Sequence, residues 1–361
     1  MTKLIDICDI QYGYAFDSAC FTEDDSYLPL VRIRDVKRGF SETFYSGEYP
    51  EEYVIHKGDL IVGMDGEFNI ARWKSIDALL NQRVCKLKAK EGTNEEYLRF
   101  ALVKALKTIE DKTAFVTVKH LSAKELNKLE LDMPGIEEQN VRAESMAKLE
   151  KVISHRKEEL SALDNLIKAR FVEMFGDITT GNYKYDTRKL GDVANVGSSH
   201  RVFTTEFVKK GIPFYRGTEI GELANGNKPT EPFYISEEHY NRLVYNDTKP
   251  QVGDLLLPSI CNKGQVWMVD TDEPFYYKDG RVLCISPDRE IFDTKYLEYF
   301  MKAKTLVEYP KLGSGSTFAE FKIFLLKDID VLIPPRELQE QFSIFVNQVD
   351  KSKVTVQKAF E

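Results

Sequence analysis

An internal duplication constrains this chain more than any other feature. Six short segments recur in the same order 184–200 residues further along the chain. The matched pairs are Lys3–Ile7 with Lys189–Val193, Pro29–Arg32 with Pro213–Arg216, His56–Ile61 with Gln251–Leu256, Gln82–Cys85 with Gly280–Leu283, Tyr97–Phe100 with Tyr296–Tyr299, and Leu131–Pro134 with Val331–Pro334. Chance does not produce so many collinear matches, so the sequence predicts two copies of one structural unit.

Both copies follow the same order of predicted elements. Short runs of β-type residues come first and are broken by Gly, Pro, Asn and Asp, as in Tyr27–Ile33 and Asp254–Leu257. A short helix follows, predicted at residues 94–108 in the first copy and 294–309 in the second. A proline then precedes a long helix, because proline is tolerated at a helix start. This order predicts an α+β fold of mixed strands and short helices.

Two long helices are predicted, one after each copy. The first runs from about Glu137 to Phe175, could span roughly 60 Å, and carries apolar residues at steps of three and four over about four heptads. Those residues are Met146, Leu149, Ile153, Leu160, Leu163, Ile167, Phe171 and Met174, with Arg156 at one position of the seam. The second helix begins near Arg336, is shorter, and has Phe342, Val346, Val349, Val356 and Phe360 at similar spacing. We expect the two helices to pair as an antiparallel coiled coil.

The predicted boundaries follow from these helices. Residues 1–135 form the first domain, 136–177 the central long helix, 178–335 the second domain and 336–361 a short C-terminal helix. The hydrophobic content of 42% is enough for a sizeable core in each domain. The N-terminus lacks a secretion signal, and no apolar run is long enough for a membrane span. The five cysteines form no CxxC pair, which favours a reducing cytoplasm over a disulfide framework.

Four motifs stand out along the chain. They are Gln11–Phe16, Lys57–Gly66, His120–Ser122 ahead of Met133-Pro134 and Glu137–Gln139, and Leu163-Asp164 with Ala169–Phe171 and Met174–Asp177. Together they resemble the specificity subunits of type I restriction-modification systems. The resemblance covers essentially the whole chain, and the second copy departs from it at Pro258–Gly264, where the first has Met64-Asp65-Gly66.

The resemblance implies a DNA-reading subunit that is not itself an enzyme. Each copy would be a target-recognition domain that reads half of a bipartite, asymmetric site in double-stranded DNA, and the helices would set the spacer. Two methyltransferase subunits would dock on this chain and bring S-adenosylmethionine, and restriction subunits would complete the complex. Self-association through the short C-terminal helix is a further expectation. The net charge of −8 weighs against DNA binding by the chain as a whole, so a local basic groove or a partner would supply phosphate contacts.

The residues agree with an absence of catalysis in this chain. No Asn/Asp-Pro-Pro-Tyr/Phe segment is present to seat an adenine for methylation, and no GxGxxG joins a strand to a helix. The five histidines have no metal-ligand spacing.

Candidate DNA contacts are polar, basic and aromatic residues in the loops of each domain, because Arg, Asn and Gln read base edges and Lys, Ser and Thr contact phosphates. In the first domain they are Tyr12, Tyr14, Arg32, Asn69, Arg72, Trp73, Thr117, Lys119 and His120. In the second they are His200, Arg201, Arg216, Asn262, Lys263, Gln265, Ser316 and Thr317. Trp73 fits the core equally well, and Arg32 and Arg216 fit a buried structural role equally well.

Two alternatives stay open at the level of sequence. The chain could be the recognition portion of a self-contained restriction-methyltransferase, which methyl transfer by the chain alone would reveal. It could also be a scaffold that uses its coiled coil only for assembly.

Overall fold

The repeated sequence builds the same antiparallel sheet twice. The computed structural model describes residues 1–112, 120–244, 249–313 and 319–358. One sheet has the strand order β2 (Cys8–Tyr12), β10 (Val84–Ala89), β7 (Leu60–Gly63) and β8 (Ile70–Arg72). Its counterpart has the order β15 (Ala194–Gly197), β22 (Val282–Pro287), β19 (Leu255–Pro258) and β20 (Trp267–Met268). Leu60 pairs with Leu87 in the first, and Leu255 with Ile285 in the second, so the duplication extends to strand register.

The same turn enters the central strand of each sheet. Gly58 and Gly253 have φ angles of 99° and 86°, which side chains other than glycine rarely adopt. The following aspartates, Asp59 and Asp254, each accept a hydrogen bond of 2.9 Å from the backbone N–H three residues earlier. The repeated Gly-Asp pair therefore shapes this turn rather than binding a ligand.

A second sheet completes each domain. In the first domain the order is β3 (Phe21–Thr22), β5 (Phe44–Tyr45), β4 (Leu28–Val31), β9 (Ala78–Leu80) and β6 (Val54–Ile55). In the second it is β16 (Phe207–Val208), β18 (Phe233–Ile235), β17 (Ile212–Tyr215) and β21 (Tyr276–Tyr277). One parallel pair recurs, β4 with β9 and β17 with β21. Short pairs are β1 (Thr2–Lys3) with β11 (Glu130–Leu131), β14 (Thr187–Lys189) with β23 (Asp330–Leu332), and β12 (Gly176–Asp177) with β13 (Asn182–Tyr183).

Short helices connect the strands. In the first domain these are α1 (Leu4–Ile7), α2 (Ile33–Arg38), α3 (Glu95–Lys112) and α4 (Ala123–Lys128), with 3-10 turns at Ser18–Cys20 and Glu51–Tyr53. In the second they are α6 (Leu190–Val193), α7 (Gly217–Ala224), α8 (Glu237–Leu243), α9 (Thr294–Glu308) and α10 (Ile323–Lys327), with 3-10 turns at Thr204–Glu206 and Tyr309–Leu312. The predicted α+β fold is confirmed, and α3 and α9 lie where short helices were expected.

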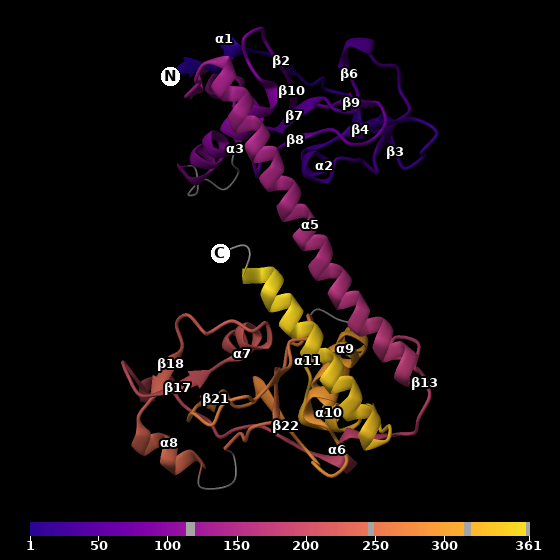
Figure 1. The fold of residues 1–361 in the computed structure, drawn as a ribbon, viewed down its shortest axis with the longest axis vertical. Coiled ribbons are helices and arrows are strands. Elements are labelled where there is room, and N and C mark those ends of the chain that lie inside the picture. The colour runs from indigo at the N-terminus through magenta and orange to yellow at the C-terminus, as the bar shows by residue number, and fades with distance from the viewer. Residues whose placement is uncertain (113–119, 245–248, 314–318, 359–361) are drawn as a thin grey trace. The chain divides into compact units, whose positions relative to one another are not determined.

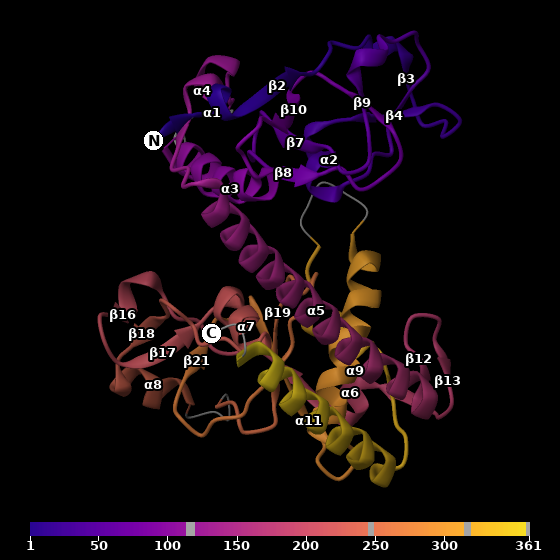
Figure 2. The ribbon, with the colours of Figure 1, turned by 45° about the horizontal axis from the view of Figure 1, so that its top comes forward.

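The long helices also form as predicted. α5 runs from Ile136 to Phe175 and α11 from Arg336 to Lys358. Contacts divide the chain into unit 1, Met1–His155, and unit 2, Arg156–Glu361. The boundary falls inside α5, so the first half of this helix packs with unit 1, beside α3, and its second half with unit 2, beside α11 (Figures 1 and 2).

Within unit 2 the second half of α5 and α11 run antiparallel, as predicted. The rings of Phe171 and Phe342 are 5.4 Å apart between centroids, and Lys353 Nζ lies 2.6 Å from Asp164 Oδ1. The residue number falls along α5 as it rises along α11, which defines the antiparallel direction. Phe171, Phe342 and Phe175 are buried in a core that also contains Tyr296 of α9.

Candidate nucleic-acid interface

In unit 1 the loop after β2 lies against the connection from β9 to β10. The backbone N–H of Tyr14 donates to the Leu80 carbonyl at 2.9 Å, and that of Gln82 donates to the Tyr14 carbonyl at 2.8 Å. The Tyr14 ring is 42% exposed and packs edge-on against Phe16. Tyr14 therefore presents an aromatic face to solvent beside residues 80–84. Tyr12 instead donates its hydroxyl to Asn127 Oδ1 at 2.8 Å, and burial raises the pKa of Tyr12 to about 12.

Two further segments meet the same connection. Met64 N–H donates to the Arg83 carbonyl at 2.8 Å, and Leu121 N–H donates to the Met64 carbonyl at 2.7 Å. His120 contacts Asp65 through Nδ1, and Arg83 Nη1 lies 3.2 Å from the same nitrogen. The first loop, the central loop and the segment before the long helix thus converge around Arg83.

Unit 2 repeats this convergence with different side chains. Ser198 Oγ donates to the Val282 carbonyl and accepts from Gly280 N–H, both at 2.9 Å. The central loop follows the same pattern, since Ser259 N–H donates to the Arg281 carbonyl at 2.9 Å. Phe321 N–H donates to the Ser259 carbonyl at 2.8 Å, as Leu121 does in unit 1. Arg281 therefore occupies the position of Arg83.

Several predicted residues of unit 2 lie on exposed loops. His200 and Arg201 are exposed, and the Arg201 guanidinium lies 5.5 Å from the Phe203 ring centre. Asn262 and Lys263 are also exposed, and Gln265 Oε1 accepts a 3.1 Å bond from Lys263 N–H. Thr117, Lys119, Ser316 and Thr317 lie outside the described residues.

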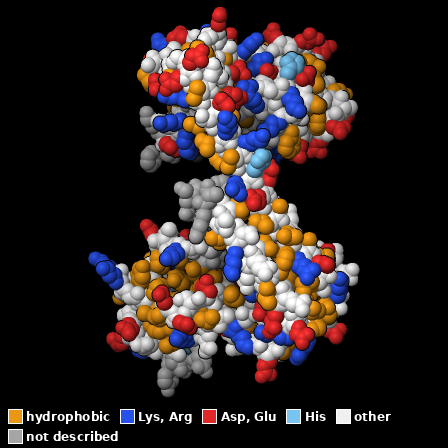
Figure 3. Space-filling model, viewed as in Figure 1, with side chains coloured by type: hydrophobic (Ala, Val, Ile, Leu, Met, Phe, Trp, Pro, Cys, Tyr) orange, Lys and Arg blue, Asp and Glu red, His pale blue; other side chains and the backbone are white. Residues whose placement is uncertain are grey.

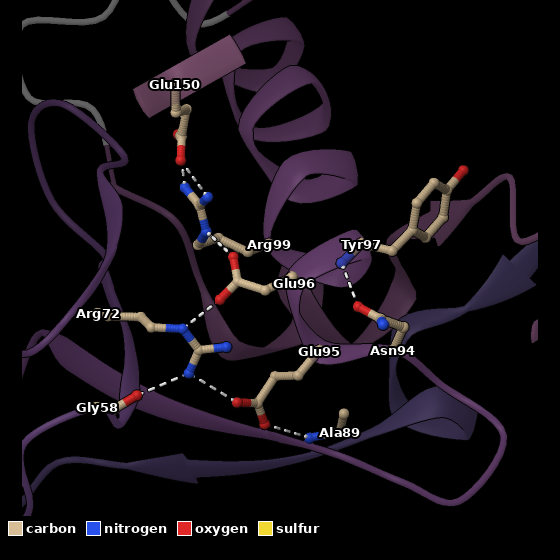
Figure 4. A network of polar contacts seen from close by, with 9 residues as sticks. All are labelled: Gly58, Arg72, Ala89, Asn94, Glu95, Glu96, Tyr97, Arg99 and Glu150. Atoms are coloured by element: carbon tan, nitrogen blue, oxygen red, sulfur yellow. Dashed lines mark hydrogen bonds and ion pairs between the residues drawn. The ribbon is translucent and has the colours of Figure 1, made fainter. Parts of the chain in front are cut away.

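Arg72 is partly buried and lies in an ion-pair network (Figure 4). Its Nη1 is 2.9 Å from Glu95 Oε1 and donates to the Gly58 carbonyl at 2.7 Å, while its Nε binds Glu96. Burial opposes the charged form of Arg72, but its bonds to Glu96 and Glu95 outweigh that effect and raise its pKa. These contacts give Arg72 a structural role, and the DNA contact predicted at this residue stays a prediction.

The network continues from α3 to α5. Arg99 Nε donates to Glu96 Oε2 at 2.8 Å, and its two terminal nitrogens donate to Glu150 at 2.9 and 2.6 Å (Figure 4). Burial opposes ionisation of Glu96, but hydrogen bonds from Arg99 and Arg72 hold the pKa of this carboxyl below its ordinary value. A bidentate arginine–carboxylate pair fixes both distance and angle, so it orients α3 on α5.

Trp73 belongs to the core. Its side chain is 1% exposed and packs in a cluster with Val31, Val36 and Ile61, and Nε1 donates to the Ile76 carbonyl at 2.6 Å. Of the two interpretations of Trp73, the structure favours the one in which it packs in the core.

Arg32 and Arg216 occupy equivalent positions before α2 and α7. Their backbone N–H groups donate to Asp35 and Glu219, at 2.9 and 2.7 Å. The Arg32 side chain is exposed, which corrects the idea of a buried structural arginine there. The Arg216 side chain is bound to Glu219 and lies 4.5 Å over the Phe233 ring, which favours a structural role.

Asn69 lies in the turn between β7 and β8. Its side-chain nitrogen donates to Glu67 at 3.4 Å, and its carbonyl accepts from Gly63 N–H at 2.8 Å. The residue is partly exposed and holds the turn closed. Residue-type reasoning missed Arg83 and Arg281, although both lie in the matched segments Gln82–Cys85 and Gly280–Leu283 and are the arginines that those segments share.

The described residues offer little for covalent or metal chemistry. Burial raises the pKa of the Cys8, Cys85 and Cys284 thiols to about 12 and that of Cys261 to about 11, so these thiols are protonated at neutral pH. Within the described ranges, no group of three or more His, Cys, Asp or Glu side chains is placed to hold a metal ion. In the same ranges, no helix has the length and apolar character needed to cross a membrane.

Acidic and basic side chains alternate over the visible face of both units (Figure 3). The charge at the two convergence points is also mixed, because Arg83 pairs with Asp65 and Arg281 with Glu320, on a chain with a net charge of −8.

Comparisons with known proteins agree with this arrangement. The family model described as type I restriction modification DNA specificity domain matches residues 1–164 and 182–359. The chain is 28% identical to the type I restriction enzyme EcoBI specificity subunit of Escherichia coli, over 94% of this chain and 76% of that protein. It is 20% identical to the MjaVIII specificity subunit of Methanocaldococcus jannaschii, over 93% and 84%.

Solved structures share the fold. The S subunit of a type I system from M. genitalium aligns with a TM-score of 0.56 at 14% identity, over 99% of this chain and 90% of that one. A chain from a study of assembly and conformational transition of the type I R-M system aligns with a TM-score of 0.52 at 18% identity, over 99% and 91%. Two matched copies of the domain model span nearly the whole sequence, and they coincide with the two copies of the fold. The chain therefore belongs to the family of type I restriction-modification DNA specificity domains.

Proposed function

We propose that this chain is the specificity subunit of a type I restriction-modification enzyme and that each unit reads one block of a two-part DNA site. One observation carries the proposal. Three loops converge on the same strand connection in both units, around Arg83 and Arg281, while the side chains around that point differ. Two domains that share a backbone arrangement but differ in their loop side chains can each recognise a different DNA sequence.

The loops have the chemistry for contact with a DNA groove. Each convergence point combines a guanidinium with hydroxyl, amide or imidazole groups, which are the donors and acceptors that read base edges. Exposed Lys263 and Arg201 could neutralise phosphates in unit 2. The acidic remainder of the chain lowers non-specific affinity, so the complex would depend on other subunits for part of its grip on DNA.

We also propose that α5 and α11 set the gap between the blocks and dock two methyltransferase subunits. Met146, Leu149 and Ile153 of α5 are 47%, 57% and 41% exposed, an apolar stripe at heptad spacing that a partner helix would cover. The methyltransferase subunits would bring S-adenosylmethionine and perform methyl transfer, and restriction subunits would cleave. This chain would act in the cytoplasm and would contribute recognition and no catalytic group.

The test is selection from a double-stranded DNA library with a randomised central segment. The full chain, purified with the methyltransferase subunits that it binds, is expected to enrich two blocks of defined bases separated by a fixed gap. Insertion of one heptad in both α5 and α11 should lengthen the gap and leave the blocks unchanged. Binding of methyltransferase without any base preference would favour a scaffold instead. Methyl transfer by this chain alone would favour a self-contained restriction-methyltransferase.

A further inference from the structure

Arg83 has an unusual backbone. Its φ angle of 73° is the only positive φ of a residue other than glycine among the described residues. That conformation costs free energy for a residue with a Cβ atom, and it persists where the surrounding structure imposes it. The Arg83 carbonyl accepts a hydrogen bond from Met64 N–H at 2.8 Å, and Val84 N–H donates to the Asn81 carbonyl at 3.1 Å.

The Arg83 side chain is held and exposed at once. Its Nε lies 3.6 Å from Asp65 Oδ2, and its Nη1 lies 3.2 Å from His120 Nδ1. Asp65 also binds His120, so the acid, the imidazole and the guanidinium form a closed triangle. The Arg83 side chain is 51% exposed, and no described residue bonds its Nη2. Among the described residues, the guanidinium is therefore held between Asp65 and the His120 ring, with Nη1 at 3.2 and 3.3 Å from the two ring nitrogens, and its Nη2 is left without a bond.

Arg281 of unit 2 is also exposed and bound by a neighbouring side chain, but that neighbour is a different residue type. Its Nη1 donates to Glu320 Oε2 at 2.7 Å, and Glu320 also accepts from Ser259 Oγ at 3.4 Å. Glu320 stands at the position of His120, immediately before the residue that bonds the central loop. The Arg281 side chain is 58% exposed. Although the anchors differ, both units hold an arginine at this one point.

An exposed arginine gains little stability from an ion pair, because solvent screens the attraction. Anchoring it has a clearer benefit for recognition. A pre-oriented guanidinium loses less conformational entropy when it forms two parallel hydrogen bonds, and the O6 and N7 atoms of guanine in the major groove accept such a pair.

We propose that Arg83 and Arg281 are the equivalent base-reading residues of the two units, each contacting a guanine in a different block of the target. The proposal rests on the function proposed above. Asp65, His120 and Glu320 are positioning residues that aim the guanidinium. It follows that each block should contain a G·C pair that depends on one of these arginines alone.

The test applies the randomised library to the full chain in complex with the methyltransferase subunits that it binds, and to the same complex with the variants Arg83→Gly, Arg83→Lys and Arg281→Ala. Glycine suits the positive φ, so Arg83→Gly removes the side chain without adding backbone strain. Arg142→Ala, which removes an exposed arginine from α5, is the matched control. Arg83→Gly should reduce discrimination at one G·C pair of one block by about 10- to 100-fold and leave the other block intact. Arg281→Ala should do the reverse, and Arg83→Lys should resemble Arg83→Gly because lysine lacks the fork.

Three outcomes are distinguishable. Loss at one pair of one block, crossed between the two arginines, supports the proposal. Unchanged base preferences in both variants overturn it. So does a uniform loss of affinity on all sequences with a salt slope smaller by about one, which is the signature of a phosphate contact. If the unaltered complex enriches no block, the proposed function fails, and that failure is visible before any variant is made.

Discussion

In both units, a buried glutamine of the long helix bonds to the backbone of the domain, and we call this contact the glutamine clamp. Gln139 of α5 accepts from Asn94 N–H at 2.9 Å and donates to the Pro134 carbonyl at 2.8 Å. Gln339 of α11 accepts from Asp293 N–H at 3.0 Å and donates to the Pro334 carbonyl at 2.8 Å. Both glutamines are buried, at 3% and 0% exposure. The joint between domain and helix is thus part of the duplicated framework.

The outer faces of the same two helices differ. Phe342 is fully buried, whereas Arg142 at the equivalent position of α5 is 49% exposed and pairs with Glu138. Val349 is 6% exposed, whereas Leu149 is 57% exposed. In unit 2 this face of α11 is covered by the second half of α5. The glutamine contact therefore belongs to each domain, whereas the other helix face is covered by a second helix in α11 and is exposed in the first half of α5.

The largest expected effect is on this helix contact. Phe342→Ala should destabilise unit 2 by about 3–5 kcal/mol, because it leaves a cavity beside Phe171 and Phe175. Arg142→Ala should change the stability of unit 1 by less than about 0.5 kcal/mol. The two tryptophans report the units separately, since Trp73 lies in unit 1 and Trp267 in unit 2. Urea unfolding followed by Trp267 fluorescence in a Trp73→Phe background measures the first, and the reciprocal background measures the second. Equal losses of stability in Phe342→Ala and Arg142→Ala would mean that these two helix positions contribute equally to their units.

The glutamine clamp should have a smaller and symmetrical effect. Gln139→Ala and Gln339→Ala each remove the side-chain partner of one backbone N–H and two backbone carbonyls, and we expect each substitution to cost about 1–3 kcal/mol in total. Each substitution should lower the stability of its own unit by a similar amount, read by the tryptophan of that unit. A loss in only one unit would show that the joint has diverged.

The ionic contacts beside the clamp should contribute less. Arg99 binds Glu150 in unit 1, and Lys295 lies 3.6 Å from Asp350 in unit 2. A double-mutant cycle with Arg99→Met and Glu150→Gln should give a coupling of about 0.5–1 kcal/mol, because Glu150 is half exposed. The looser Lys295–Asp350 pair should give less. If the coupling is zero for both pairs, the glutamine clamp alone fixes each long helix to its domain.

The smallest expected effect is on the stability of unit 1 at acidic pH. The folded-state pKa of Glu96 lies below its ordinary value, so its ionised form stabilises unit 1 above the unfolded pKa of about 4.3. That contribution is lost as pH falls through the lowered folded pKa. Unfolding of unit 1 followed by Trp73 should therefore show a decline in stability below about pH 4.3, and Arg99→Met should flatten it. A decline of the same steepness in the variant would place its origin elsewhere.

Much of the fold was predictable because it depends on patterns that survive duplication. Collinear segments revealed the two copies, and apolar residues at steps of three and four revealed α5 and α11. Pro134 and Pro334 placed the starts of these helices. The boundary between units was not accessible in this way, since it lies inside α5 and depends on which residues each half of the helix contacts.

The site was less predictable, because residue type does not reveal what a side chain touches. Arg72 and Trp73 have the chemistry of DNA contacts, yet one is bound to Glu95 and Glu96 and the other packs in the core. Residue type alone did not distinguish Arg83 from the other arginines, although the repeat matches it to Arg281. A matched arginine inside variable loops was the available signal.

Independent reading of one block by each unit is essential to the proposed function. It is tested most directly by replacing residues 1–135 with the first recognition domain of another family member and mapping methylated adenines across the genome of a host that expresses the assembled system. The account predicts that one block of the methylated site changes while the other block stays the same. A site in which both blocks change, or in which neither changes, would contradict it.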